Sequence, residues 1–241
     1  YIISALRNLS RHRTYSLINI AGLTVGLGLT ILLLSFIRYE LSYEEFNTKK
    51  DRIYRSVSRV NFSENKAINA PVTTGLTYDW AVDEVPAVEA ALRMDPRPAT
   101  IEYQDNLFRN GYGYYADSTF FKFFDLNLKY GNKKDALDNR GIVLSEKLAN
   151  RIFNQENPLG KTVHWRGYDL EVTGVLEKLP KNTHLRIDFL VSFSVVSDMN
   201  TYFQRRGIST YVYYLLKEEA NTSANIKKLD SFLEAEINDF F

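Results

Sequence analysis

A run of 21 residues without a charged side chain, near the start of the sequence, constrains the fold more than any other feature. It extends from Leu17 to Ile37 and contains only four polar residues. As a helix rising about 1.5 Å per residue it would measure roughly 32 Å, close to the hydrocarbon core of a bilayer at about 30 Å. The apolar part of a cleaved signal peptide is shorter, usually about 7–15 residues. We therefore expect a retained transmembrane helix over residues 17–39.

Charges on either side of this run predict its orientation. Arg7, Arg11 and Arg13 precede it, and three acidic residues follow between positions 40 and 45. Positively charged flanks favour the cytoplasmic side, so these three arginines would set the topology, with residues after about 40 in the periplasm. Residues 1–16 alternate apolar and basic side chains at helical spacing. We interpret them as a cytoplasmic amphipathic segment on the inner membrane face, or equally as the flank of a longer helix.

Small residues recur along one face of the predicted membrane helix. Gly22, Gly26 and Thr30 follow at intervals of four residues. Such a stripe lets a second helix approach closely in lipid, and we predict helix packing there. Glycine is common in membrane helices, so chance is the alternative explanation.

Composition excludes several classes of function for the remainder. The chain carries a net charge of +1, and residues 1–39 hold four arginines and no acid, so the rest carries a net −3. A weakly acidic body argues against nucleic-acid binding, which needs a concentrated basic face. There is no cysteine, which removes disulfides and thiolate chemistry. The ends, Tyr1 and Phe241, lead us to expect that the sequence is part of a longer protein.

The residues after the membrane segment predict a mixed domain of the α+β class. Strands and helices follow one another without the regular alternation of parallel βαβ folds. Four phenylalanines between 120 and 124 are expected in the core rather than in a ligand site, since each gains about 2 kcal/mol on burial. We expect strands at 51–60, 90–94, 100–103, 142–144, 162–165, 170–176, 185–193 and 209–217, and helices at 71–83, 117–124, 145–153 and from 223 onward.

No pattern in the sequence predicts a catalytic, cofactor or metal site. His12, His164 and His184 are not spaced for a zinc site. The adjacent pair Glu44-Glu45 is expected merely to solvate a surface. No phosphate-binding loop or nucleophile elbow is present in the sequence. We therefore expect no enzymatic activity, and any ATP that powers the protein would be bound by another polypeptide.

A series of short motifs resembles the MacB/FtsX-type ABC transporter permeases that lack a fused ATPase. No single motif is specific, but their order and spacing cover nearly the whole chain. Glu44 and Asn47 depart mildly from the pattern, since aspartate and histidine are expected there. The motifs are Ala5–Leu9, Asn19–Leu23, Glu40–Tyr43 with Phe46, Asp51–Arg55, Ala116–Phe121, Val143–Glu146, Asn157–Lys161, Val172–Val175, and Pro180–Leu185 leading to Asp188 and Phe189.

This resemblance implies a domain organisation and a function. The outer part would be a periplasmic core domain with a porter-like βαβ lobe, residues 40–104 and 208–241, and an inserted Sabre-like lobe, residues 105–207. Three more membrane helices would follow. The protein would be a permease subunit of the bacterial inner membrane, working by mechanotransmission: ATP-driven closure on the cytoplasmic side moves the periplasmic domain, for export or periplasmic signalling.

The resemblance also implies partners. They are a separate ABC ATPase subunit on the cytoplasmic side, a second permease in a dimer, the lipid bilayer and a periplasmic adaptor. A singly anchored periplasmic sensor or adaptor is the alternative, because 16 Tyr and 15 Phe could line a ligand cleft. A membrane-anchored enzyme is the third hypothesis, and no residue pattern supports it.

Overall fold

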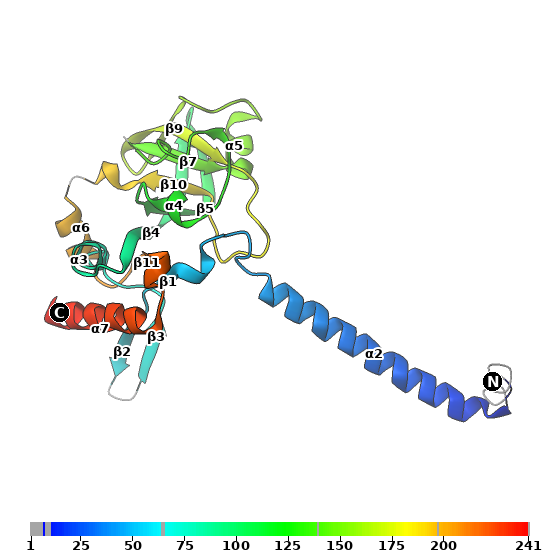
Figure 1. Cartoon of the computed structure of the whole chain (residues 1–241). Coiled ribbons are helices and arrows are strands. Elements are labelled where there is room, and N and C mark those ends of the chain that lie inside the picture. The colour runs from blue at the N-terminus through cyan, green and yellow to red at the C-terminus, as the bar shows by residue number, and fades with distance from the viewer. Residues whose placement is uncertain (1–6, 8–10, 64–65, 139, 197, 241) are drawn as a thin grey trace. The chain divides into compact units, whose positions relative to one another are not determined.

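The computed structural model describes residues 7, 11–63, 66–138, 140–196 and 198–240 (Figure 1). The described chain divides into two compact units. The first, which we call the helix unit, holds the residues up to 45 together with 182–184. The second, the outer domain, holds residues 46–181 and 185–241. Most of the predicted segment 1–16 lies outside the described residues.

The helix unit is built on one long helix, α2, Arg13–Leu41. It is apolar enough to cross a membrane, with a mean hydropathy of 2.3 over its best window. None of its residues is buried by the protein, as expected for a surface that lipid would cover. The predicted span of 17–39 lies within this helix, which continues by one turn at its N-terminal end.

The outer domain is built on a nine-stranded sheet that confirms the α+β prediction. Its path is β1-β11-β4-β5-β10-β7-β9-β6, and β8 pairs with both β4 and β9. β2 and β3 form a separate two-stranded hairpin. The strands are β1 Ile53–Arg55, β2 Ser58–Ser63, β3 Lys66–Ala70, β4 Val88–Tyr103, β5 Asn106–Ala116, β6 Leu128–Gly131, β7 Gly141–Ser145, β8 Thr162–Trp165, β9 Tyr168–Leu176, β10 Phe189–Ser192 and β11 Tyr211–Leu216.

Helices cover the sheet, and some of them begin at a side chain that caps the first turn. Ser145 accepts a hydrogen bond from the Leu148 amide, and Asp198 accepts one from the Thr201 amide, as N-cap side chains do. The α-helices are α3 Thr77–Glu84, α4 Phe120–Phe123, α5 Glu146–Phe153, α6 Met199–Arg206 and α7 Ser223–Phe240; short 3-10 turns are η1 Lys50–Arg52, η2 Phe193–Val195 and η3 Glu218–Ala220.

The phenylalanine-rich segment belongs to the core, as predicted. Phe120 and Phe123 have no exposed surface, and Phe124 is 2% exposed. They pack with apolar residues of β4, β10 and β11. The opposite face of β11 and β4 packs against α3 and α7, so the sheet near β11 is covered on both faces.

The long strand β4 is the main departure from the predicted elements. We expected two strands, at 90–94 and 100–103, and Pro96 and Pro98 lie between them. The structure has one 16-residue strand instead. Its first half pairs with β11 and its second half with β5, and Pro98 lies next to a register shift, where proline is tolerated in a sheet. β4 lies within the predicted porter-like lobe of residues 40–104, and the lobe boundaries at 104 and 208 stay a prediction.

Candidate functional site

The outer end of α2 is closed by a tight turn. The amide of Ser42 donates to the carbonyl of Arg38, 3.1 Å away, and its hydroxyl donates to Tyr39 O at 2.7 Å. Glu44 then adopts a left-handed conformation with φ of 61°. This conformation is uncommon outside glycine and persists where surrounding contacts hold it. The contacts that hold Glu44 come from a loop far away in the sequence.

That loop is Asn182–His184, which lies in the helix unit although its neighbours on both sides belong to the outer domain. The Glu44 amide donates to Asn182 O, 3.0 Å away. In return, the Asn182 side-chain amide donates to the carbonyl of Ser42 and to its Oγ at 3.1 Å. We call residues Ser42–Glu45 and Asn182–His184 the outer joint.

The Glu44 carboxylate is the centre of the outer joint. Its Oε1 accepts hydrogen bonds from Thr183 Oγ1 at 2.8 Å and from the His184 amide at 2.7 Å. The Nδ1 of His184 also lies 2.7 Å from this oxygen. Partial burial on its own would raise the pKa of Glu44, but the hydrogen bonds from His184 and Thr183 hold it below its ordinary value. Glu44 is therefore ionised at neutral pH. Because a charged acceptor makes stronger hydrogen bonds than a neutral one, ionisation strengthens these contacts.

The next residues of the chain are fixed within the outer domain. Asn47, 3% exposed, donates from Nδ2 to the carbonyl of Phe123 at 2.9 Å. The amide and hydroxyl of Thr48 both donate to Asp125 Oδ2, at 2.7 and 2.6 Å. Burial acts to raise the pKa of Asp125, and these two hydrogen bonds lower it further than burial raises it. Asn47 and Thr48 are thus attached to the end of the phenylalanine-rich helix α4.

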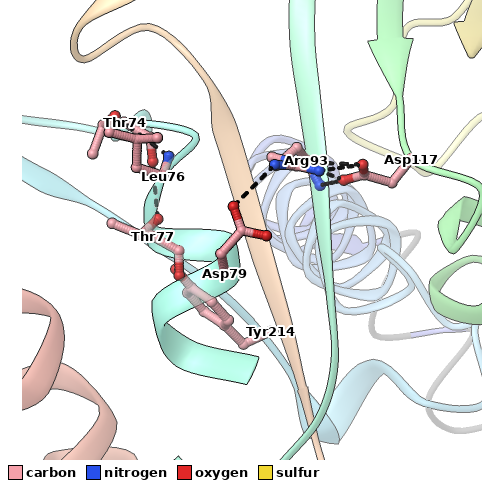
Figure 2. Close-up of polar contacts among 7 residues, drawn as sticks. All are labelled: Thr74, Leu76, Thr77, Asp79, Arg93, Asp117 and Tyr214. Carbon is pink, nitrogen blue, oxygen red and sulfur yellow. Dashed lines mark hydrogen bonds and ion pairs between the residues drawn. The ribbon is translucent and has the colours of Figure 1, made fainter. Parts of the chain in front are cut away.

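A second polar group is buried along β4. Arg93 lies between Asp117, at the end of β5, and Asp79 of α3 (Figure 2). Its guanidinium makes a two-pronged contact with Asp117, with Nη2–Oδ1 of 2.8 Å and Nε–Oδ2 of 3.0 Å. Asp79 is 3.7 Å away, and the Tyr78 ring lies 4.1 Å from the guanidinium carbon.

Two residues further along β4, Asp95 has no exposed side-chain surface. It accepts hydrogen bonds from Arg97, from the hydroxyl of Tyr202 and from Arg206, the last at 3.2 Å. Burial first, and then the Asp95 charge, raise the pKa of Tyr202, so its hydroxyl stays protonated and donates. We call the residues around Arg93 and Asp95 the β4 cluster. It joins β4 to α3, α6 and the end of β5.

The start of α3 is fixed from the same strands. The Tyr214 hydroxyl on β11 donates to the carbonyl of Thr77 at 3.2 Å, and Thr77 Oγ1 donates to Thr74 O at 2.9 Å (Figure 2). We expected a helix over 71–83, a range in which Thr73 and Thr74 are of a residue type that often caps a helix N-terminus. The helix begins at Thr77 and its N-cap, Leu76, makes no side-chain capping bond. Thr74 acts instead in the preceding turn, with the Leu76 amide 3.4 Å from its Oγ1.

The structure leaves the predicted helix-packing and topology residues untested. Gly22, Gly26 and Thr30 lie on α2 with open space around the glycines, and Thr30 Oγ1 donates to the carbonyl of Gly26 at 2.8 Å. Arg7, Arg11 and Arg13 are exposed. Both sets stay predictions. In the part of the chain that the structure describes, no three His, Asp or Glu residues group closely enough to hold a metal ion.

The interpretation of Glu44 as part of a solvated pair was wrong. We expected Glu44-Glu45 to be a solvated pair, but Glu44 accepts three contacts from the loop Asn182–His184. A signal was present, because Glu40–Tyr43 and Pro180–Leu185 both belong to the motif series. Nothing in either segment showed that they meet. The β4 cluster gave no local signal, since its members are spread from Asp79 to Arg206.

Comparison with known protein families decides what this arrangement belongs to. Residues 16–232 match the model of the MacB-like periplasmic core domain. The chain belongs to this family. The match begins inside α2 and ends inside α7, so it includes the outer joint and the β4 cluster. The resemblance to MacB/FtsX-type ABC transporter permeases is thereby confirmed. No curated protein is significantly similar to the chain in sequence.

Solved structures support the fold. The periplasmic region of MacB from Actinobacillus actinomycetemcomitans matches with a TM-score of 0.60 and 18% identity, over 78% of this chain and 85% of that one. A domain of a putative permease protein from Porphyromonas gingivalis matches with a TM-score of 0.58 and 21% identity, over 71% and 75% of the two chains. At these identities the likeness concerns the fold alone.

Proposed function

We propose that this MacB-like chain is part of a permease subunit of a bacterial ABC transporter of the mechanotransmission type. Its place would be the inner membrane, with the outer domain in the periplasm and a separate ABC ATPase bound on the cytoplasmic side. A membrane helix can transmit motion to a periplasmic domain only if residues at the end of the helix are bonded to residues connected to that domain. The outer joint carries this proposal, because it links the end of α2 to a loop 140 residues away in the sequence.

The chemistry of the joint suits transmission of force rather than catalysis. Its hydrogen bonds run in both directions, from Glu44 N to Asn182 O and from Asn182 Nδ2 to Ser42. Several hydrogen bonds in both directions hold the two segments together more firmly than a single contact would. A two-state mechanical element needs only different contacts in its two states, and the joint supplies a set that can be made or broken.

The first experiment is recovery of the full-length protein from detergent-solubilised native membranes, with mass spectrometry of what co-purifies. An ABC ATPase in stoichiometric amount is the expected result. Its absence in several mild detergents, with the protein running as a monomer, would favour the singly anchored sensor or adaptor.

Transmission itself is tested by distance measurement. Spin labels at Glu40, at the end of α2, and at Lys178, an exposed position on the outer domain, report their separation with and without ATP in the reconstituted complex. We expect an ATP-dependent change in the native protein that Glu44→Ala abolishes or broadens. An unaltered ATP response in Glu44→Ala would show that the joint does not transmit the motion.

A further inference from the structure

Six strands of the outer domain form a closed ring. β4 pairs with β5, β5 pairs with β10, and the ring continues through β7 and β9 to β8. β8 closes the ring by pairing with β4 at Glu102 and His164. Tyr115 of β5 and Trp165 of β8 belong to one apolar core, with ring centres 5.1 Å apart. Closed rings of strands often bind small ligands at their ends, so the groups around Tyr115 decide which ligand fits there.

Helix α6 and a tight turn lie at this end of the ring. The Tyr115 ring centre lies 5.9 Å from that of Tyr202 on α6 and 5.4 Å from that of Phe193 in η2. The turn between β8 and β9 starts at Arg166, which has a left-handed φ of 52°. The side chain of Arg166 is exposed, and its guanidinium carbon lies 5.9 Å from the Trp165 ring centre. Arg166 therefore brings a positive charge to the end of the ring.

Positive charge exceeds negative charge at this end of the ring. Arg97 and Arg206 both pair with the same carboxylate, that of Asp95, so one of their two charges is uncompensated. Arg166 forms no ion pair with any residue that the structure describes. The guanidinium carbon of Arg97 lies 5.7 Å from the Tyr115 ring centre. Burial raises the pKa of Tyr115, and the charges of Arg166 and Arg97 oppose this rise, which places both guanidinium groups near the Tyr115 hydroxyl.

Two buried donors lie beside these charges. Trp165 is 1% exposed, and its Nε1 has no hydrogen-bond partner among the described residues. Tyr115 is 4% exposed, and its hydroxyl forms no hydrogen bond within the described part of the chain. A buried donor without a partner costs free energy, and most buried polar groups in native proteins do have one. A ligand with acceptor oxygens would satisfy both donors and both charges.

We propose that Arg97, Tyr115, Trp165 and Arg166 bind a phosphate group. A phosphate monoester carries a charge of about −1.5 to −2 at neutral pH, which balances the two uncompensated guanidinium charges. A carboxylate would balance only one of them. Guanidinium groups bind such oxyanions well because their planar forks present several N–H donors. The hydroxyl of Tyr115 and the indole N–H of Trp165 would donate to the remaining oxygens. The proposal goes beyond the transporter assignment and does not depend on it.

The test uses the full chain in phosphatidylcholine nanodiscs, with isotopically labelled tryptophan. The chain has two tryptophans, so NMR resolves their two indole N–H signals, and Trp80→Phe assigns them. At constant ionic strength, inorganic phosphate or glycerol 3-phosphate should shift the Trp165 signal saturably and the Trp80 signal less. Tighter binding of the ester would identify an organic phosphate as the ligand, and tighter binding of the inorganic ion would identify free phosphate. Acetate, with one charge, should bind at least about 10-fold more weakly than either.

Matched variants separate the site from general attraction of anions. Arg166→Gln should weaken phosphate binding at least about 10-fold, whereas Arg59→Gln, the same change at an exposed position of β2, should leave it unchanged. Tyr115→Phe should weaken binding about 3- to 10-fold without lowering Tm, and Tyr211→Phe, at a half-buried tyrosine of β11, is its control.

Three results would overturn the proposal. The first is the absence of a saturable shift of the Trp165 signal with either phosphate, which would mean that water alone satisfies the indole N–H. The second is binding of acetate as tight as that of phosphate. The third is a phosphate affinity that neither Arg166→Gln nor Tyr115→Phe changes.

Discussion

The outer joint and the β4 cluster are both built around carboxylates, but their surroundings differ. In the β4 cluster, Arg93 and Asp117 are 8% and 10% exposed and contact each other through two pairs of atoms. In the outer joint, Glu44 is 22% exposed and His184 is 39% exposed, and the contacts run to both main-chain and side-chain atoms of a short loop. The buried charges bind elements of one domain together, whereas the joint can open without exposing a core.

This difference in burial predicts that the β4 cluster affects the stability of the outer domain and that the outer joint affects local movement. Breaking a buried ion pair leaves an uncompensated charge in a low dielectric. Breaking the joint lets water replace the lost partners, at a net cost near that of ordinary hydrogen bonds. We therefore expect the β4 cluster to control the unfolding of the outer domain, and the joint to control local opening with little effect on unfolding.

The largest effect should come from Asp117→Ala, which leaves Arg93 buried with only the more distant Asp79. We expect a loss of about 3–5 kcal/mol in the free energy of unfolding, or roughly 6–20 °C in Tm for a domain of this size. Thermal unfolding of the full chain in detergent, followed by circular dichroism, measures it. Glu89→Ala removes the partner of the more exposed Arg52 and should cost less than about 1 kcal/mol. Equal changes in Tm for Asp117→Ala and Glu89→Ala would contradict the view that burial makes the Arg93–Asp117 ion pair the more important one for stability.

A smaller effect is expected from Tyr202→Phe, which removes one donor to Asp95 and leaves Arg97 and Arg206 in place. Loss of a hydrogen bond to a charged group costs about 1.5–3 kcal/mol. Tyr168→Phe is the matched control, because the Tyr168 hydroxyl has no hydrogen-bond partner among the described residues. The same unfolding measurement should separate the two. If Tyr202→Phe were as stable as Tyr168→Phe, the Tyr202 contact with Asp95 would contribute nothing to the cluster.

The joint should respond differently to loss of its carboxylate. Glu44→Ala removes the acceptor of three contacts, so amide exchange at His184 should become about 10-fold faster, the change that a loss of about 1.4 kcal/mol gives. Tm should change by less than about 3 °C. Glu40→Ala, four residues earlier at an exposed position of α2, is the control. A large drop in Tm for Glu44→Ala would place the joint with the β4 cluster as a stabilising element.

Sequence reasoning predicted those parts of the fold that depend on local patterns. The long apolar helix α2 follows from an uncharged run, and the helix after Ser145 follows from a cap and an apolar face with Leu148 and Ile152. The phenylalanine segment was placed in the core for its apolar area. Each of these features is determined by residues within about 20 positions of one another.

Features that depend on distant pairing were missed. The continuity of β4 depends on β11 and β5, which hold the segment extended despite Pro96 and Pro98. The β2–β3 hairpin and helix α6 were not predicted either. The hairpin is inserted between Ser56 and Thr73, whose amides donate to the carbonyls of Val212 and Thr210. The outer joint unites two segments that the motif series contained, yet spacing along a chain does not tell which segments meet.

The smallest effect expected is the pH response of the joint. Hydrogen bonds keep the pKa of Glu44 below its ordinary value of 4.5, so its contribution is fully present above that pH and is lost as the pH falls through the lowered pKa. The amide shift of His184, which donates to this carboxylate, should titrate by NMR with a midpoint below 4.5. Glu44→Gln should remove the titration and retain one acceptor oxygen. A midpoint at or above 4.5 would mean that the His184 and Thr183 contacts do not favour the ionised form, and the joint would then resemble a solvated surface pair.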